Sequence, residues 1–131
     1  MSRKKSREYV FRLVFEKFFH EPEIDIEFGD EDFALTEEDK VFASTMLGGI
    51  NENYDSIMDT IKLNSIGYEV DRIFKIDLAI LLVATNELVN YKETPVKVVV
   101  NEAVELSKKY STDKSYSFIN GVLAKIIKNI E

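Results

Sequence analysis

Apolar residues recur at intervals of three and four along most of the chain, and this spacing is what most constrains the fold. The first such repeat follows one buried helical face and consists of Phe11, Val14, Phe15 and Phe18. Similar repeats predict further helices at about 37–61, 73–91, 94–110 and from 113 onward. With two prolines and five glycines in 131 residues, little interrupts these repeats. The sequence therefore predicts one all-α domain, residues 1–131.

Two helix starts carry recognisable capping signals. Thr36 and Asp39 resemble a capping box, in which each side chain satisfies the other residue's backbone N–H. Thr94 is the expected N-cap of a later helix, with Pro95 at its first position, where the missing N–H costs nothing. In that later helix, Glu105 is expected to pair with a lysine four residues on.

Glycines suggest two local features within the helices. The long helix that follows Thr36 is expected to bend near Gly48 and Gly49. Gly121, in the last helix, is expected to permit close approach of a neighbouring helix.

The net charge of -7 conceals three unlike segments. Residues 1–17 hold six bases and two acids, whereas residues 18–39 hold ten acids and neither lysine nor arginine. The remaining residues are nearly balanced. The field at the N-terminus is therefore positive within an acidic protein, and the acidic segment is expected to lie away from it.

Signatures of catalysis, metal binding and membrane insertion are not found in the sequence. There is no cysteine and no glycine-rich phosphate loop, and the lone histidine, His20, is expected at a helix end on the surface. The acidic segment lacks calcium-loop spacing. Asp77, without a partner carboxylate at helical spacing, is expected to be a surface or interface acid. We expect a cytoplasmic protein with no enzymatic activity, cofactor, metal or membrane association.

The apolar stripe of the first helix turns basic toward its N-terminus. Stepping back from Phe11 at helical intervals reaches Arg7 and then Lys4 and Arg3. Cations at a helix N-terminus oppose the macrodipole, so helix stability does not explain them. We expect these turns to overhang the core or to lie along an open groove, with Arg3, Lys4 and Arg7 on the surface. On charge alone they could form a phosphate-binding arm or a solvated tail. Arg12 is expected to pair with its acidic neighbours.

Four stretches resemble the NusB family of bacterial transcription antitermination factors. They span both ends of the chain, and their order and spacing are specific. The stretches are residues 6–16, 72–88, 94–110 and 114–123, the third of which reads TPVKVVVNEAVELSKKY.

The resemblance implies an all-α fold of about six to seven helices in two packed subdomains. It also implies binding of single-stranded boxA-type RNA from ribosomal RNA transcripts, jointly with NusE, a ribosomal small-subunit protein. The complex would then act on RNA polymerase to suppress termination.

Carried over by position, the resemblance also implies site residues. The RNA-binding positions are Arg3, Lys4 and Arg7 in the basic arm and Ser115 and Phe118 in the last helix, and the position that meets NusE is Asp77. A basic arm and an exposed aromatic ring suit a single-stranded target, because phosphates and splayed bases are its recognisable parts.

The chain departs from the family pattern at three positions, which are Leu82, Lys114 and Ser117. Two other functions remain as alternatives. One is a helical scaffold that binds only protein. The other is the NusB-like module of a ribosomal RNA cytosine methyltransferase, against which the missing cysteine and the short length argue.

Overall fold

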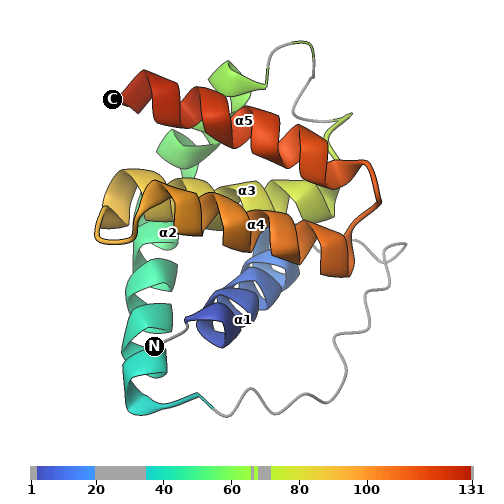
Figure 1. Ribbon diagram of the computed structural model, residues 1–131. Helices are drawn as coiled ribbons and strands as arrows, with labels where there is room; N and C mark the ends of the chain where they lie inside the picture. The colour runs from blue at the N-terminus through green and yellow to red at the C-terminus, as the bar shows by residue number, and fades with distance from the viewer. Residues whose placement is uncertain (1–2, 20–34, 66, 68–71, 131) are drawn as a thin grey trace.

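The computed structural model describes residues 3–19, 35–65, 67 and 72–130 of the chain. These residues form five α-helices, two of which continue into a wider π-helical turn (Figure 1). The elements in chain order are α1 (Lys4–Val14), η1 (Phe15–Phe19), α2 (Glu37–Asn64), α3 (Lys75–Asn86), η3 (Glu87–Tyr91), α4 (Val96–Tyr110) and α5 (Ser115–Ile130). No strand occurs in the described ranges. The predicted all-α class is confirmed, and the number of helices is slightly lower than expected because η1 and η3 extend existing helices.

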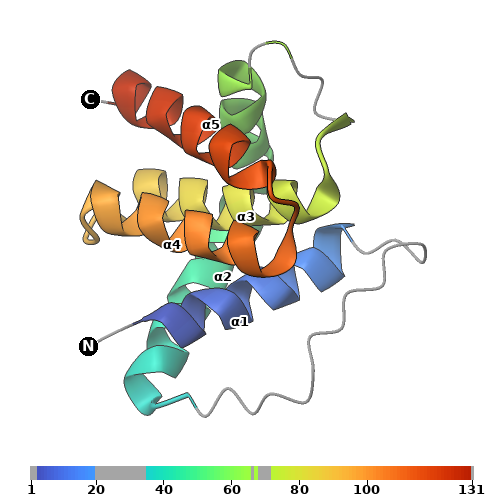
Figure 2. The ribbon, with the colours of Figure 1, turned by 45° about the vertical axis from the view of Figure 1, so that its right-hand side comes forward.

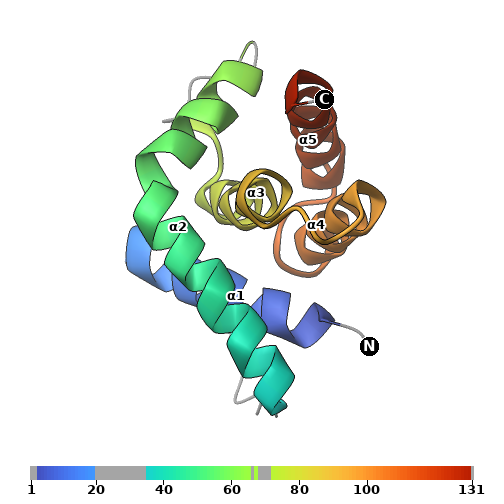
Figure 3. The same ribbon diagram turned by 90° about the vertical axis from the view of Figure 1, so that its left-hand side faces the viewer.

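Helix α3 forms the centre of the molecule. Every residue from Ile76 to Leu88 is buried, which accounts for a sequence that is apolar on nearly all sides. Figure 3, which looks along α3, shows α2 on one side of it, α4 and α5 on the other, and α1 crossing beneath. This arrangement packs two groups of helices against a shared central helix.

Helix α2 starts at the predicted capping box but bends later than predicted. Thr36 Oγ1 accepts from the Asp39 backbone N–H, and an Asp39 carboxylate oxygen accepts from the Thr36 N–H, both at 3.1 Å. The Thr36 backbone bond is the main cause that lowers the pKa of Asp39. The non-helical backbone lies at Asn53, whose Nδ2 donates to the Gly49 carbonyl at 2.9 Å. The bend expected at Gly48 and Gly49 is therefore found four residues further on.

Gly49 serves a packing role instead. A Cβ at this position would lie 2.9 Å from the Asn86 side-chain oxygen, too close for real atoms. The glycine thus allows α2 to approach α3. Gly121 is the opposite case, because nothing lies within 4 Å of its ideal Cβ position. The close helix approach expected at Gly121 is not present within the described chain.

One detail of α4 differs from the sequence-based expectation. The N-cap is Pro95 rather than Thr94, and it supplies no side-chain hydrogen bond. Lys109 also has a long-range partner, because its Nζ forms an ion pair with Glu8 of α1 at 2.5 Å. Long-range packing places α1 against the end of α4, and this contact is not visible in the local pattern.

Candidate nucleic-acid interface

The basic N-terminal turns are only partly exposed. Arg3 precedes α1, is half-buried, and donates from Nη1 to the Tyr91 hydroxyl at 2.8 Å. Its guanidinium carbon lies 4.5 Å from the centroid of the Phe42 ring, within the range of a cation–π contact. Arg3 thereby rests against α2 and the end of η3.

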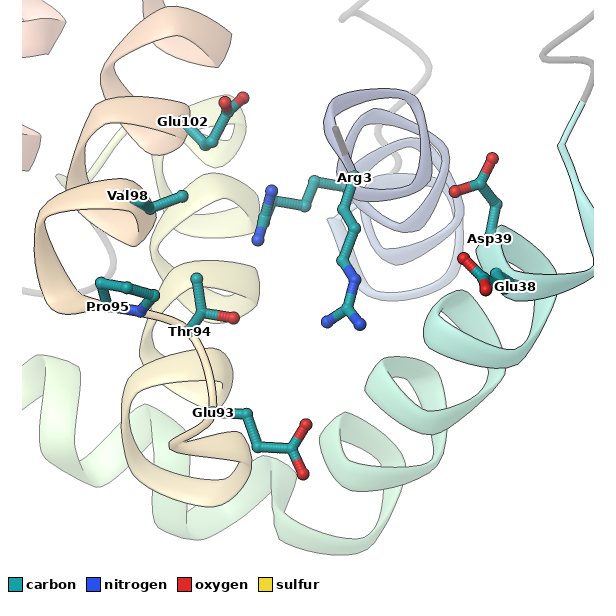
Figure 4. Close-up of a pocket in the computed structure, with 9 residues that line it drawn as sticks. Arg3, Glu38, Asp39, Glu93, Thr94, Pro95, Val98 and Glu102 are labelled. Carbon is teal, nitrogen blue, oxygen red and sulfur yellow. The ribbon is translucent and has the colours of Figure 1, made fainter. Parts of the chain in front are cut away.

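Arg3 lies in a pocket of about 430 Å³ whose charged lining is mainly acidic. Figure 4 shows carboxylates on opposite sides of Arg3, with Glu93 and Glu102 on one side and Glu38 and Asp39 on the other. The arginine charge is thus set among acids. An RNA phosphate entering this pocket would meet carboxylates as well as Arg3, so the pocket itself is a poor phosphate site.

Arg7 is buried, contrary to the expectation that it lies on the surface. Its Nε and Nη2 donate to the two carboxylate oxygens of Glu87 at 2.8 and 2.7 Å. The side chains of Arg7 and Glu87 are 6% and 1% exposed. This two-point geometry is the strongest that arginine offers a carboxylate, and it joins α1 to η3. Arg7 therefore belongs to the buried interior, and Lys4, one turn earlier, is the first exposed base on this face of α1.

The exposed charge of the first helical turn belongs to Lys4 and Lys5. The sequence analysis selected Lys4 and passed over Lys5, because Lys5 lies off the stripe that continues into the apolar face. The consecutive bases Arg3, Lys4 and Lys5 could have indicated that Lys5 is also exposed. Arg12, further along, pairs with Glu16 at 3.5 Å, as expected.

The middle of α1 contacts the end of α4. Glu8 is buried and accepts from Lys109 Nζ at 2.5 Å and from the Tyr110 hydroxyl. Figure 2 shows the last turn of α4 lying over α1. These bonds hold the middle of the basic N-terminal helix against the last turn of α4, which leads into α5.

The turn between α4 and α5 is organised around Asp77. The Asp77 residue, expected as a surface or interface acid, is only 5% exposed in the chain by itself. It accepts from the Ser111 hydroxyl at 2.6 Å, and Ser111 Oγ lies 2.8 Å from Ser115 Oγ. Burial raises the pKa of Asp77, while the hydrogen bonds from Ser111 and Ser115 oppose the rise. Asp77 therefore fixes where α5 begins.

Ser115 and Phe118, the RNA-binding positions that the resemblance implies in the last helix, are both at least half-buried. Ser115 is buried and its hydroxyl is hydrogen-bonded within the turn, where Thr112 Oγ1 lies 2.9 Å away. Phe118 is half-buried and lines a second pocket, of about 550 Å³. Lys114, one of the positions that depart from the family pattern, lines the same pocket. This pocket shares no lining residue with the one around Arg3.

Tyr116 is the aromatic side chain that sequence reasoning missed. It lines the second pocket and is 47% exposed, so a ring face is accessible to solvent. Lys108 Nζ lies 5.7 Å from its ring centroid. An exposed aromatic ring beside lysines supplies stacking and phosphate attraction together. The signal available in the sequence was its place in the first turn of α5, off the buried face.

The described residues contain no cluster of three metal-ligating side chains, and no described helix is long and apolar enough to span a membrane. Within those ranges the surface features near the predicted residues are exposed lysines, an exposed aromatic ring and the two pockets described above. Together with the fold, they define the class as an all-helical domain whose surface suits the binding of another macromolecule.

Comparison with known proteins agrees with this class. The NusB family model matches residues 4–128. A protein of Lachnoclostridium phytofermentans named transcription antitermination protein NusB is 43% identical, over 97% of this chain and 99% of its own length. A Clostridium perfringens protein of the same name is 38% identical over the whole of both chains.

A solved structure of T. maritima NusB superimposes with a TM-score of 0.82 at 30% identity, covering 98% of this chain and 92% of the other. The chain belongs to the NusB family.

Proposed function

We propose that this protein is a non-enzymatic transcription antitermination factor that binds boxA-type single-stranded RNA together with NusE. On this proposal residues 1–131 act as one cytoplasmic RNA-binding domain within an antitermination complex of RNA polymerase. The names of the relatives support the role in antitermination.

One observation supports RNA as the ligand. The exposed lysines lie on α1, which Glu8 joins to Lys109 and Tyr110 at the end of α4, and the exposed ring of Tyr116 lies in the first turn of the next helix, α5. Lysines attract phosphates without reading sequence, while an aromatic ring stacks on a splayed base. The proposed surface therefore runs from Lys4 and Lys5 to Tyr116, Phe118 and Lys114.

The buried candidates take indirect roles in this proposal. Arg3 reaches RNA only if it leaves its contacts with Tyr91 and Phe42, whereas Arg7 holds α1 in place through Glu87. Ser115 and Asp77 set the position of the first turn of α5. Asp77 would influence NusE chiefly through that turn, because little of its side chain is exposed.

Fluorescence anisotropy with labelled boxA and scrambled RNA, each with and without NusE, tests the proposal. We expect NusE to increase affinity for boxA more than for the scrambled strand. Equal binding of the two RNAs in the presence of NusE would reject boxA recognition. Binding of NusE without RNA affinity would favour the protein-only scaffold.

A matched pair of variants tests the aromatic contact. Tyr116→Ala should weaken boxA binding by about 1–3 kcal/mol, the usual contribution of one stacked base. Tyr116→Phe keeps the ring and should bind nearly as well as the wild type. Equal affinity of the alanine and phenylalanine variants would exclude stacking on this residue.

A further inference from the structure

A second surface, separate from the proposed RNA site, lies where α4 begins and α5 ends. Val96, Val100 and Ile127 give it an apolar lining, and Lys97 and Asn101 complete a groove of about 420 Å³. Figure 1 shows the first turn of α4 and the C-terminal end of α5 on the same side of the molecule, away from the turn that joins the two helices.

The core leaves the apolar side chains of this groove incompletely covered. Val96 is 41% exposed, and Val100 and Ile127 are half-buried. Ile130, one turn beyond Ile127 in α5, is 44% exposed. Single exposed apolar residues are common on protein surfaces, but these side chains gather at one hollow between two helices.

The charged residue among those that line the groove is a lysine, Lys97. The first turn of α4 contains no acid and carries Lys97, and its N-cap residue, Pro95, makes no side-chain bond to the free N–H groups. A lysine there opposes the helix macrodipole, so the stability of α4 does not account for it. Helix α5 contains no Asp or Glu, whereas it carries Lys125 and Lys128.

We propose that this groove docks an acidic amphipathic segment of a partner protein. Apolar side chains of the segment would cover Val96, Val100 and Ile127, while its carboxylates pair with Lys97 and the first-turn N–H groups of α4. The apolar lining favours a protein over a nucleic acid, because phosphates would leave the valines and the isoleucine exposed. This inference does not depend on the proposed RNA function.

Chemical-shift mapping of the nitrogen-15-labelled full chain tests the proposal with three synthetic peptides. The first is an amphipathic helix with Leu and Ile on one face and Glu beside them. The second replaces Glu with Lys, and the third replaces Leu and Ile with Ser. We expect the first peptide alone to shift the backbone signals of Val96, Lys97, Val100 and Ile127.

Two groove variants and one control sharpen the test. Val96→Glu places a carboxylate in the groove at a helix start that tolerates it, and Lys97→Glu reverses the local charge. Each should weaken binding of the acidic peptide by about tenfold, because like charges would then face each other at the interface. The Lys4→Glu/Lys5→Glu variant alters the N-terminal arm and should leave peptide binding unchanged.

Four results would overturn the proposal. They are the absence of shifts with the acidic peptide, shifts centred outside the groove, equal binding of the lysine-flanked peptide, and unchanged affinity in both groove variants. RNA affinity measured on the same variants keeps the two proposals distinct. A loss of RNA binding in Lys97→Glu would assign this surface to nucleic acid instead.

Discussion

The ion pair between Arg7 and Glu87 shows how one residue can look functional in sequence and be structural in the fold. Its two partners lie 80 positions apart, and both are nearly inaccessible to solvent. Periodicity placed Arg7 correctly on the stripe that leads into Phe11. It could not reveal that an acid from η3 would meet that stripe inside the protein, because this depends on how distant helices pack.

Removing one member of this pair should cost more than removing both. Arg7→Ala leaves the Glu87 carboxylate buried without its partner, and the free energy of unfolding should fall by about 3–5 kcal/mol. The double variant Arg7→Met/Glu87→Leu retains volume without charge and should lose far less. Urea denaturation measures both. If the double variant lost as much as Arg7→Ala or more, uncompensated buried charge would not explain the loss.

Asp77 gives a prediction about pH. Because burial raises its pKa in the folded protein, the folded state binds this proton more tightly than the unfolded chain does. The stability contributed by the proton is complete below the unfolded pKa of about 3.9 and is lost as pH rises through the higher folded value. At neutral pH the protein therefore bears the cost of a buried carboxylate.

The Asp77→Asn variant removes that cost and keeps an oxygen that can accept from Ser111. At neutral pH the free energy of unfolding of the variant should equal or exceed that of the wild type. As the pH falls toward about 4.5, the wild type should gain stability relative to the variant. Urea unfolding at the two pH values measures the change. A difference that is independent of pH would rule out titration of Asp77 as its source.

At the scale of elements, local patterns predicted the helices well and their irregularities poorly. Apolar spacing located the five α-helices of the described ranges, and the capping box at Thr36 and Asp39 marked the start of α2. The π-helical turns and the bend at Asn53 depend on contacts made after the helices pack. Gly49 illustrates this, since its small size is required by Asn86 on another helix.

Two glycine-to-alanine substitutions distinguish the effect of tight helix packing from the effect of helix propensity on stability. Gly49→Ala should lower the free energy of unfolding by about 1–3 kcal/mol, because the new methyl group forces Asn86 to move. Gly121→Ala meets no neighbour and should raise it by about 0.5–1 kcal/mol through helix propensity. Thermal or urea unfolding distinguishes the two. The same sign for both would show that the space around Gly49 and Gly121 does not decide their roles.

At the scale of the whole molecule, the family was recognisable from four stretches of sequence, while the binding surface needed the structure. The resemblance marked Lys4 and Phe118 as candidates by position. Only the packed helices reveal that Arg7 and Ser115 are buried and that Lys5 and Tyr116 are exposed. Burial depends on the partners of each helix, so no local pattern could have sorted these candidates.

The salt dependence of RNA binding at saturating NusE tests the RNA-binding surface most directly. Anisotropy titrations from about 50 to about 200 mM salt should give the wild type a log–log slope near -3, as expected when about four phosphates of a single strand are neutralised. The Lys4→Glu/Lys5→Glu variant should bind more weakly, with a slope less negative by about 1.4. Lys128→Glu is a control that makes the same lysine-to-glutamate change about 20 Å along α5 from Ser115. It should bind RNA as the wild type does. An arm variant that keeps the wild-type affinity and slope would contradict the assignment of this surface to RNA.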